Sequence, residues 1–374
     1  MPGKIMLVGL GGVAKAALQL MVTKPEIKTI VVASRNGQQG EAFCNLVAAG
    51  ALAQGFQPQI DTVSVDLNQP ERTAEIISLE NPDVIFSTAT LMSPWLTGRL
   101  PLEVNLALYP AGFGVWLPMH LPLTMKLMRA VRLAGYRGIT LTAPFPDIVN
   151  CMLAGMNLSP TSGIGNVDLY IPKVKRLAAE ALGVSTADIE VKLVAHHALM
   201  PYFMGLATDH HPPFHLAVKY RGADVTREID ARKLLATHLP AIVGPETNYV
   251  TASSAVRLIQ AFLSEKDTET HAPSPNGLPG GYPVTVNSHG IKLSLVEGVT
   301  TEQAIQINED SQPFDGIQRI KPDGTAVFTD AAVQALTASF HFTCNELHPD
   351  ESPALAEELL AKVRERMQIG NQER

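Results

Sequence analysis

Two adjacent histidines, His196 and His197, stand in the segment VAHHALMP, after an apolar run and before a proline. An imidazole has an ordinary pKa of about 6.5, so it can both accept and donate a proton near neutral pH. The apolar residues at 190–195 predict a strand, and neighbouring side chains of a strand point to opposite faces. We therefore expect at most one of the two histidines to face a site. The alternative is that both only complete the strand.

A glycine-rich turn, GLGGVA, lies at residues 9–14, between a strand expected at residues 4–9 and a helix expected at residues 13–22. In dinucleotide-binding proteins such a turn is tight, lets the backbone approach a pyrophosphate, and places the phosphates at a helix N-terminus. The alternative is a domain of this fold that has lost its nucleotide. The residues expected to bind the cofactor here are Gly9, Gly11, Gly12, Val13 and Ala14.

The end of the second expected strand, ASRN, bears on which dinucleotide binds. An NAD site usually has an acidic residue near this point, whereas an arginine suits the 2′-phosphate of NADP. The chain offers Ser34, Arg35 and Asn36, with no acid before Glu41. Arg35 keeps its charge and can bind a phosphate through two parallel hydrogen bonds. We therefore expect NADP rather than NAD, the alternative being that Arg35 is a solvated loop residue.

Further cofactor contacts are expected where the third and fourth strands end. Asp66 ends the third strand, where side chains border the adenine. Ser87, Thr88 and Ala89 end the fourth strand, where small residues leave room for the ribose and the nicotinamide.

The elements that must position these residues change character along the chain. Strands alternate with helices up to residue 143, which predicts βαβ units and a parallel sheet. The second half mixes helices with hairpins around RG and at residues 314–329, and its Pro- and Gly-rich segment at residues 271–282 is expected to be a loop. The predicted fold class is α/β: a Rossmann-type dinucleotide-binding domain at 1–143 precedes a mixed α+β substrate domain at 144–374.

Composition narrows the class of protein. The 374 residues are 46% hydrophobic and 17% charged, with a net charge of −7 and no basic cluster, which argues against a nucleic-acid partner. Prolines and glycines interrupt the most apolar window, residues 106–128, so we expect no membrane helix. The start of the chain has no signal-peptide pattern. Three distant cysteines, Cys44, Cys151 and Cys344, fit a reducing, cytoplasmic compartment.

Four segments resemble the lactate/malate dehydrogenase superfamily, which also includes the NAD-dependent family 4 glycosidases. VIFSTATLMSPWLTGRLPLEVN resembles its fourth strand and substrate-closing loop, and ITLTAPFPDIVNCML its strand-then-NP turn. GIGNVDLYIPKVKRLAAEALGVSTADIEVKLVAHH resembles its long helix and the strand that delivers the catalytic histidine. GYPVTVNSHGIKLSLVEGVTTEQ resembles its late strands and the start of its last helix.

The resemblance implies roles for particular residues. It makes His197 the catalytic acid–base residue, which would protonate a carbonyl oxygen as the carbon gains a hydride. Arg99 and Lys173 take the positions of arginines that hold a substrate carboxylate, although a lysine lacks the planar fork of an arginine. Asn150 and Asn166 would help to orient a small polar substrate. Relatives of this kind commonly pair, so a homo-oligomer, such as a homodimer, is expected.

Three functions remain open at this point. The first is an NADP- or NAD-dependent oxidoreductase, a dehydrogenase acting on a small polar hydroxy or oxo compound. The second is a metal-assisted glycosidase of the family 4 type, weakened because Gly165 stands where that branch has a cysteine ligand. The third is a nucleotide-sensing protein without turnover, suggested by Ala143 in place of the usual asparagine of the NP turn.

No metal site is assigned from the sequence. The segment DHHPPFH contains Asp209, His210, His211 and His215, whose side chains suit metals. Its two prolines prevent a helix that would place His211 and His215 on one face. We therefore expect a surface or hinge loop.

Overall fold

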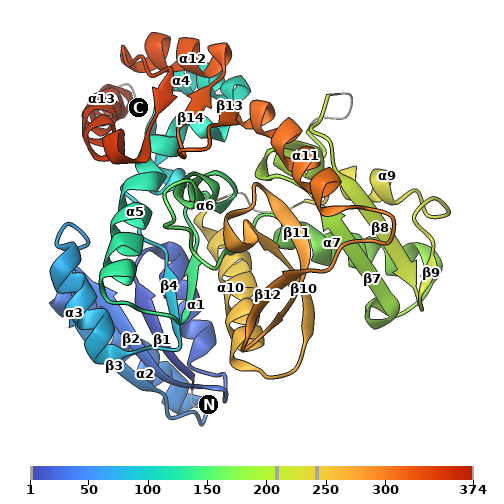
Figure 1. Cartoon of the computed structure of the whole chain (residues 1–374), viewed down its shortest axis with the longest axis horizontal. Coiled ribbons are helices and arrows are strands. Elements are labelled where there is room, and N and C mark those ends of the chain that lie inside the picture. Colours follow the sequence, from blue (N-terminus) through green and yellow to red (C-terminus); the bar gives the residue numbers. More distant parts are fainter. Residues whose placement is uncertain (1–2, 207–209, 241–243, 373–374) are drawn as a thin grey trace.

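The computed structural model describes residues 3–206, 210–240 and 244–372 (Figure 1). The first part of the chain forms a six-stranded sheet in the order β3-β2-β1-β4-β5-β6, with every pair parallel. This is the strand order of a doubly wound dinucleotide-binding fold, so the predicted Rossmann-type sheet is confirmed. The strands are β1 (Gly3–Val8), β2 (Ile27–Ser34), β3 (Gln59–Ser64), β4 (Val84–Ser87), β5 (Ile139–Thr142) and β6 (Ser162–Gly163).

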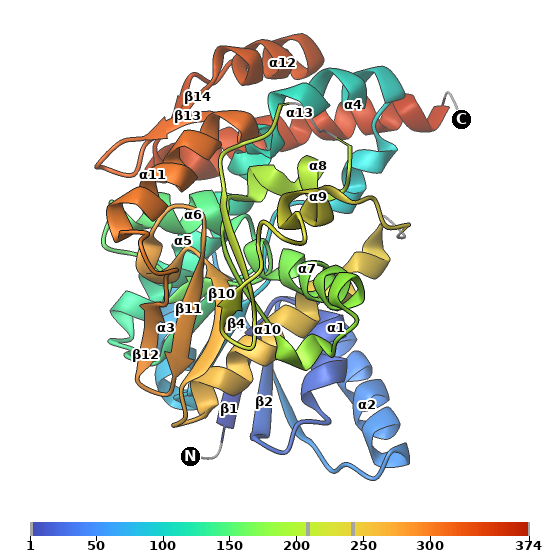
Figure 2. The ribbon, with the colours of Figure 1, turned by 90° about the vertical axis from the view of Figure 1, so that its right-hand side faces the viewer.

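Helices cover both faces of this sheet, which explains why its central strands are near-continuous apolar runs. Helices α3 and α5 pack together on one face, and α1 lies on the other with α10 from the second half beside it (Figures 1 and 2). The bounds are α1 (Gly12–Met21), α2 (Gly37–Ala53), α3 (Pro70–Glu80), α5 (Leu117–Leu133) and α10 (Asn248–Leu263).

The second half is mixed α+β, as predicted, with three small antiparallel sheets. Their strands are β7 (Ile189–Val194), β8 (His215–Tyr220) and β9 (Ala223–Asp224), then β10 (Thr268–Pro273), β11 (Gly281–Asn287) and β12 (Gly290–Leu293), then β13 (Ile317–Ile320), β14 (Ala326–Phe328) and β15 (Glu346–Leu347). The helices with which they share this half are α6 (Pro146–Ala154), α7 (Val167–Leu182), α8 (Met200–Phe203), α9 (Ala231–Ala236), α11 (Thr301–Ser311), α12 (Asp330–Phe340) and α13 (Ser352–Gln372). The short helix α4 (Leu102–Leu108) belongs to the first half.

Some expected boundaries differ from the structure. The expected loop at residues 271–282 is wrong at both ends, because β10 continues to Pro273 and pairs with β11 from Gly281 onward. The predicted hairpins are present: β8 and β9 flank the RG turn, and β13 pairs with β14. Strand β6 joins the parallel sheet beyond residue 143, so the sheet extends past the domain boundary expected there.

The last quarter of the chain packs against residues 94–133 of the first half. Phe328, Leu336, Phe340, Leu359 and Val363 share one apolar core with α5 and the sheet. This core fixes the 3₁₀ turn η8 (Gln312–Asp315), which immediately precedes β13, relative to the nucleotide-binding half. Among the described residues, no helix is both long enough and apolar enough to cross a membrane.

Candidate active site

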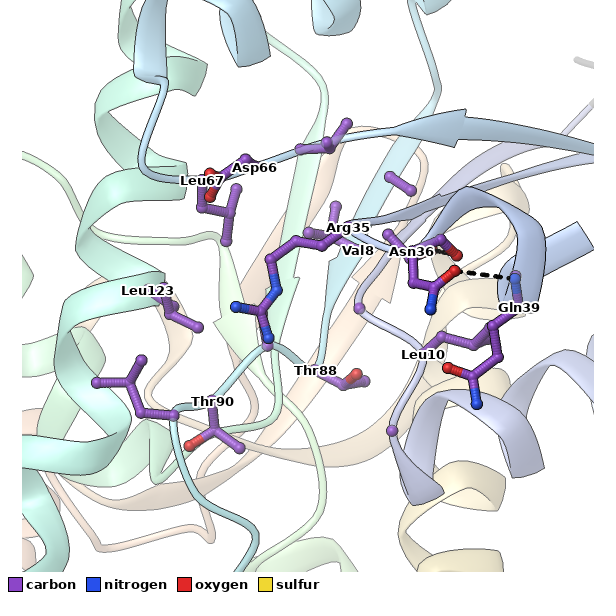
Figure 3. Close-up of a pocket in the computed structure, with 18 of the residues that line it drawn as sticks. Val8, Leu10, Arg35, Asn36, Gln39, Asp66, Leu67, Thr88, Thr90 and Leu123 are labelled. Atoms are coloured by element: carbon purple, nitrogen blue, oxygen red, sulfur yellow. Dashed lines mark hydrogen bonds between the residues drawn. The ribbon is translucent and has the colours of Figure 1, made fainter. Parts of the chain in front are cut away.

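The carboxyl ends of β1 to β4 surround a cavity of about 640 Å³ (Figure 3). The predicted cofactor residues that line this cavity are Gly9, Gly11, Ser34, Arg35, Asn36, Asp66, Thr88 and Ala89. The other four, Gly12, Val13, Ala14 and Ser87, belong to the adjoining helix and strand. The sequence did not single out Lys15, Gln39, Asn68, Thr90 or Leu123, which also line the cavity.

The glycine turn has the features that a dinucleotide requires. Gly9 has a φ of +91°, which disfavours a side chain there. Helix α1 begins after Gly11 with no side-chain cap, and a Cβ placed at Gly11 would meet nothing within 4 Å. Gly11 therefore leaves room for a ligand to approach the backbone where α1 begins, as a pyrophosphate site needs. The buried hydroxyl of Thr88 lies beside Gly9 without a hydrogen-bond partner. These residues fit a dinucleotide.

Arg35 extends into the cavity between Leu123 and Thr88 (Figure 3). No ion pair holds it among the residues that the structure describes. Its neighbour Asn36 is used locally, because its side chain accepts a hydrogen bond from the N–H of Gln39 at 3.0 Å and caps α2. Arg35 is thus the basic group at the end of β2 that is available to a phosphate.

His197 lies at the first residue of the 3₁₀ turn η5 (His197–Leu199), just past β7. Its Nδ1 is 2.7 Å from Oδ2 of Asp315, and Oδ1 of Asp315 accepts the N–H of Phe113 at 2.9 Å. Because Nδ1 faces a carboxylate, it carries the ring proton, and Nε2 of the neutral ring is the proton acceptor. The side chain of His197 is 21% exposed, whereas that of Asp315 is 4% exposed.

The two groups favour each other's charged form. Burial lowers the pKa of His197, but the charge and hydrogen bond of Asp315 and the charge of Asp147 outweigh it and raise the pKa above its ordinary value. Burial raises the pKa of Asp315, but the charge and hydrogen bond of His197, the charge of His196 and the Phe113 N–H lower it overall. Asp315 is therefore a carboxylate over the physiological range.

His196 has a different environment. It is completely buried, its Nδ1 accepts the N–H of Ala198 at 3.1 Å, and its Nε2 has no partner. Burial is the main cause that lowers its pKa to about 4, so the ring is neutral. The reading in which both histidines complete a strand is wrong, because β7 ends at Val194 and only an isolated bridge at Ala195 follows.

An aromatic wall links His197 to the nucleotide cavity. The ring of Phe113 lies 5.1 Å from that of His197 and 5.3 Å from that of His120. Nδ1 of His120 is 2.9 Å from the hydroxyl of Thr90, which lines the cavity. Burial, then the charge of His197, lowers the pKa of His120 to about 3, so this second histidine is neutral. The contacts form a continuous path from the cavity to His197.

One of the two predicted asparagines, Asn166, is bonded to a third carboxyl group, and the other, Asn150, lies one turn along the same helix as that group. Asp147, in the first turn of α6, is completely buried, and its Oδ2 accepts a hydrogen bond from Asn166, while its Oδ1 has no partner. Asn150 accepts a hydrogen bond from the hydroxyl of Thr142 at 2.9 Å, and its Nδ2 has no partner. Burial, the largest cause, raises the pKa of Asp147 to about 7.

The two predicted carboxylate-binding cations are not brought to this centre. Nζ of Lys173 donates to the carbonyls of Phe203 and, at 2.8 Å, of Leu235. Burial lowers the pKa of Lys173 to about 8. Arg99 is exposed at the end of the 3₁₀ turn η1 (Pro94–Arg99). Their contact with a substrate stays a prediction.

The histidine-rich loop shows no metal geometry in the residues described. His211 packs against the rings of Tyr202 and Phe214, and His210 against Phe314. Asp209 lies outside the described residues. Across the part of the chain that is described, no three His, Cys, Asp or Glu side chains form a group that could hold a metal ion.

Comparisons with known proteins identify the fold. No protein-family model matches the chain, and no curated protein matches it. A lactate dehydrogenase from Eimeria maxima, solved with NADH and oxamate, is 14% identical with a TM-score of 0.57, covering 83% of this chain and 91% of its own. A malate dehydrogenase from Cryptosporidium parvum is 15% identical with a TM-score of 0.56, covering 84% and 98%. A lactate dehydrogenase from a Medee basin deep-sea metagenome library is 12% identical with a TM-score of 0.56, covering 84% and 97%.

The predicted resemblance to the lactate/malate dehydrogenase superfamily is therefore confirmed as a similarity of fold. At these identities it says nothing about individual side chains. Asp315, the partner of His197, was not predicted as a site residue from the sequence.

Proposed function

We propose that this protein is a dehydrogenase that uses a nicotinamide dinucleotide to interconvert a hydroxyl and a carbonyl group on a small polar compound. The observation that carries the proposal is the His197–Asp315 pair, joined through Phe113 and His120 to a cavity whose glycine turn fits a dinucleotide. Lactate and malate dehydrogenases share the fold, and one of them was solved with NADH and oxamate. These similarities support the reaction class.

NADP is the proposed cofactor, with NAD as the alternative. The residues that would hold it are the glycine turn with Thr88 and Ala89, and Arg35 would bind the 2′-phosphate. When bound, the dinucleotide supplies the two-electron chemistry, because its nicotinamide exchanges a hydride with a carbon atom.

His197 would exchange the proton. In the direction of oxidation its neutral ring accepts the hydroxyl proton at Nε2, and in the direction of reduction the imidazolium returns it. Asp315 holds Nδ1 protonated and stabilises the imidazolium, so it is a positioning residue. Phe113 and Phe145 contact the imidazole ring on its sides and limit the access of water to it.

The test is nucleotide binding and turnover with a panel of hydroxy and oxo compounds, in the wild-type protein and in His197→Asn. We expect the substitution to lower kcat by about 10²- to 10⁴-fold while leaving the Kd of NADPH nearly unchanged. His289→Asn, at an exposed position, is the control for loss of a histidine. If NADPH binds but no compound turns over, the protein is a nucleotide sensor. Manganese-dependent cleavage of aryl or phosphorylated glycosides would instead establish the glycosidase reading. A homo-oligomer and a cytoplasmic location stay predictions from the sequence.

A further inference from the structure

The charged groups around His197 are acids and other histidines. Asp315 bonds to its Nδ1, and the charges of Asp315 and Asp147 both act on its pKa. The pKa values of His120 and His196 are lowered by burial, so those two rings carry no charge. Among the described residues, no lysine or arginine is hydrogen-bonded or ion-paired to Asp147 or Asp315. A substrate carboxylate at this centre would be repelled by these two acids, and contact of Arg99 or Lys173 with it stays a prediction.

Asp147 is the acid whose hydrogen bonds are incomplete. Asp315 is matched by the imidazolium of His197, but Asp147 receives only a neutral amide, from Asn166, and its Oδ1 receives nothing. Burial raises the pKa of Asp147 to about 7 against the charge of His197 and the hydrogen bond of Asn166, so a donor or a positive charge that reached Oδ1 would favour the ionised form. Asp147 lies in the first turn of α6, two residues after Phe145. The ring centre of Phe145 is 5.4 Å from that of His197, so Asp147 lies near the proposed acid–base residue.

We propose that the substrate carries a protonated amine that pairs with Asp147, so that the reaction interconverts an amino alcohol and an amino ketone or aldehyde. This inference rests on the proposed dehydrogenase function. An ammonium group offers Asp147 both a positive charge and N–H donors, whereas the carboxylate of a hydroxy acid offers neither and is repelled. The unpartnered amide of Asn150, one turn along α6, provides a donor for the substrate oxygen or for a second polar group.

The bonds and electrons balance without a further reactant. In the oxidation, the O–H bond breaks and its proton passes to Nε2 of His197. The C–H bond at the same carbon breaks, and the hydrogen leaves with both electrons to the oxidised dinucleotide as the C–O bond becomes double. The ammonium keeps its bonds and its charge. The products are the amino carbonyl compound, the reduced dinucleotide and one proton, which His197 releases to water.

Three compounds with one carbon skeleton test the charge preference directly. They are 1-aminopropan-2-ol, lactate and propane-1,2-diol, which place an ammonium, a carboxylate or a neutral hydroxyl beside the same secondary alcohol. With wild-type protein and NADP, we expect kcat/KM for the amine to exceed that for lactate by about 100-fold or more, the effect of matching rather than repelling a buried charge.

The variant Asp147→Asn tests whether Asp147 causes the preference for the amine. The substitution keeps the shape of the side chain, and we expect the ratio of kcat/KM for the amine to that for the diol to fall about 100-fold; the loss of the Asp147 charge also acts on His197, but it affects both substrates alike and cancels in the ratio. Asp168→Asn is the matched control, because Asp168 is also a buried aspartate of the second half but is already paired with Arg257. Should Asp147→Asn fail to fold, inhibition of wild-type turnover by isopropylamine but not by acetate gives the same information.

The outcomes separate the two proposals. If no hydroxy compound of any charge turns over, the dehydrogenase function fails, and the amine inference fails with it. If lactate or the diol turns over as well as the amine, or if Asp147→Asn keeps the preference, the amine inference alone is overturned and the dehydrogenase stands.

Discussion

Replacing Asp315 by asparagine should disable His197 while leaving its position nearly unchanged. Oδ1 at this position accepts the N–H of Phe113, and Oδ2 faces Nδ1 of His197 at 2.7 Å. An asparagine that keeps the first bond turns its NH₂ group toward Nδ1 and can only donate to it. The ring proton then moves to Nε2, and the neutral histidine can no longer accept a proton from a substrate hydroxyl.

The expected loss in kcat for oxidation is about 10²- to 10⁴-fold, the range for removal of general acid–base catalysis. The residual rate should also titrate differently. In the wild-type protein the oxidation rate rises with pH as His197 loses its proton, and the raised pKa of His197 places this rise above pH 6.5. Without the carboxylate the rise moves to lower pH. Steady-state kinetics from pH 5 to pH 10 measure both effects.

Stability gives an independent reading of the same pair. The folded-state pKa of His197 is raised, so the pair stabilises the fold fully below the unfolded pKa of about 6.5, and this contribution is lost as pH rises through the folded pKa. The pKa of Asp315 is lowered, so its part is present above its unfolded pKa and is lost only in acid. We expect Asp315→Asn to reduce the free energy of unfolding by about 2 kcal/mol at pH 6 and by less at pH 9. Urea unfolding at the two pH values measures the difference.

Asp168→Asn controls for the loss of a buried carboxylate, because the side chains of Asp168 and Asp315 are both 4% exposed. It should destabilise the fold without moving the pH profile. An Asp315→Asn enzyme with wild-type kcat and an unmoved profile would refute the tautomer argument, as would an equal change of profile in the control.

Three further substitutions test other parts of the site. Arg35→Glu should raise the Kd of NADPH by about 10- to 100-fold and that of NADH much less, as measured by the fluorescence of the bound nucleotide; equal losses would remove the argument for NADP. Gly9→Val introduces a side chain at a φ of +91°, with its Cβ 3.1 Å from the hydroxyl of Thr88, so dinucleotide affinity should fall at least 10-fold. Normal affinity measured by calorimetry would contradict the placement of the phosphates. Lys173→Met removes an ammonium that holds two carbonyls, so the free energy of unfolding should drop by about 2 kcal/mol with KM unchanged, whereas a raised KM at normal stability would restore its predicted substrate contact.

The sequence predicts the first half of the fold better than the second. Strands β1, β2 and β4 are covered by helices on both faces, so their apolar runs identify them locally. The strands β6, β9 and β15 contain two residues each and exist only because a neighbouring strand pairs with them. The side-chain pattern predicted β9 only as part of the hairpin around the RG turn, and it predicted neither β6 nor β15. The end of β10 was missed because residues 271–273 belong to a Pro- and Gly-rich segment that favours a loop, although they pair with β11.

The sequence likewise predicts some residues of the site and misses others. The glycine turn and Arg35 follow from spacing within one βαβ unit, and the resemblance of the segment around His197 pointed to that histidine. Asp315 is 118 residues away from His197 and comes from a turn for which the sequence showed only hairpin chemistry. His120 and Phe113 lie in the apolar window 106–128, for which the sequence predicted only that it is not a membrane helix. Their meeting depends on the apolar core that docks the last quarter of the chain on α5, and no local pattern records it.

Three buried aspartates show how the surroundings divide the tasks of one residue type. Asp168 is paired with the permanent charge of Arg257, which makes it a structural anchor. Asp315 is paired with an imidazole that can gain and lose its proton, and the N–H of Phe113 keeps it ionised through both states, so it can support proton transfer. Asp147 is completely buried, yet among the described residues it has only a neutral amide on one oxygen and nothing on the other. Different surroundings thus give chemically identical carboxyl groups different functions. A carboxylate that the protein leaves unmatched is stabilised most by a cation from outside the chain, so Asp147 is the residue from which we infer the charge of the substrate.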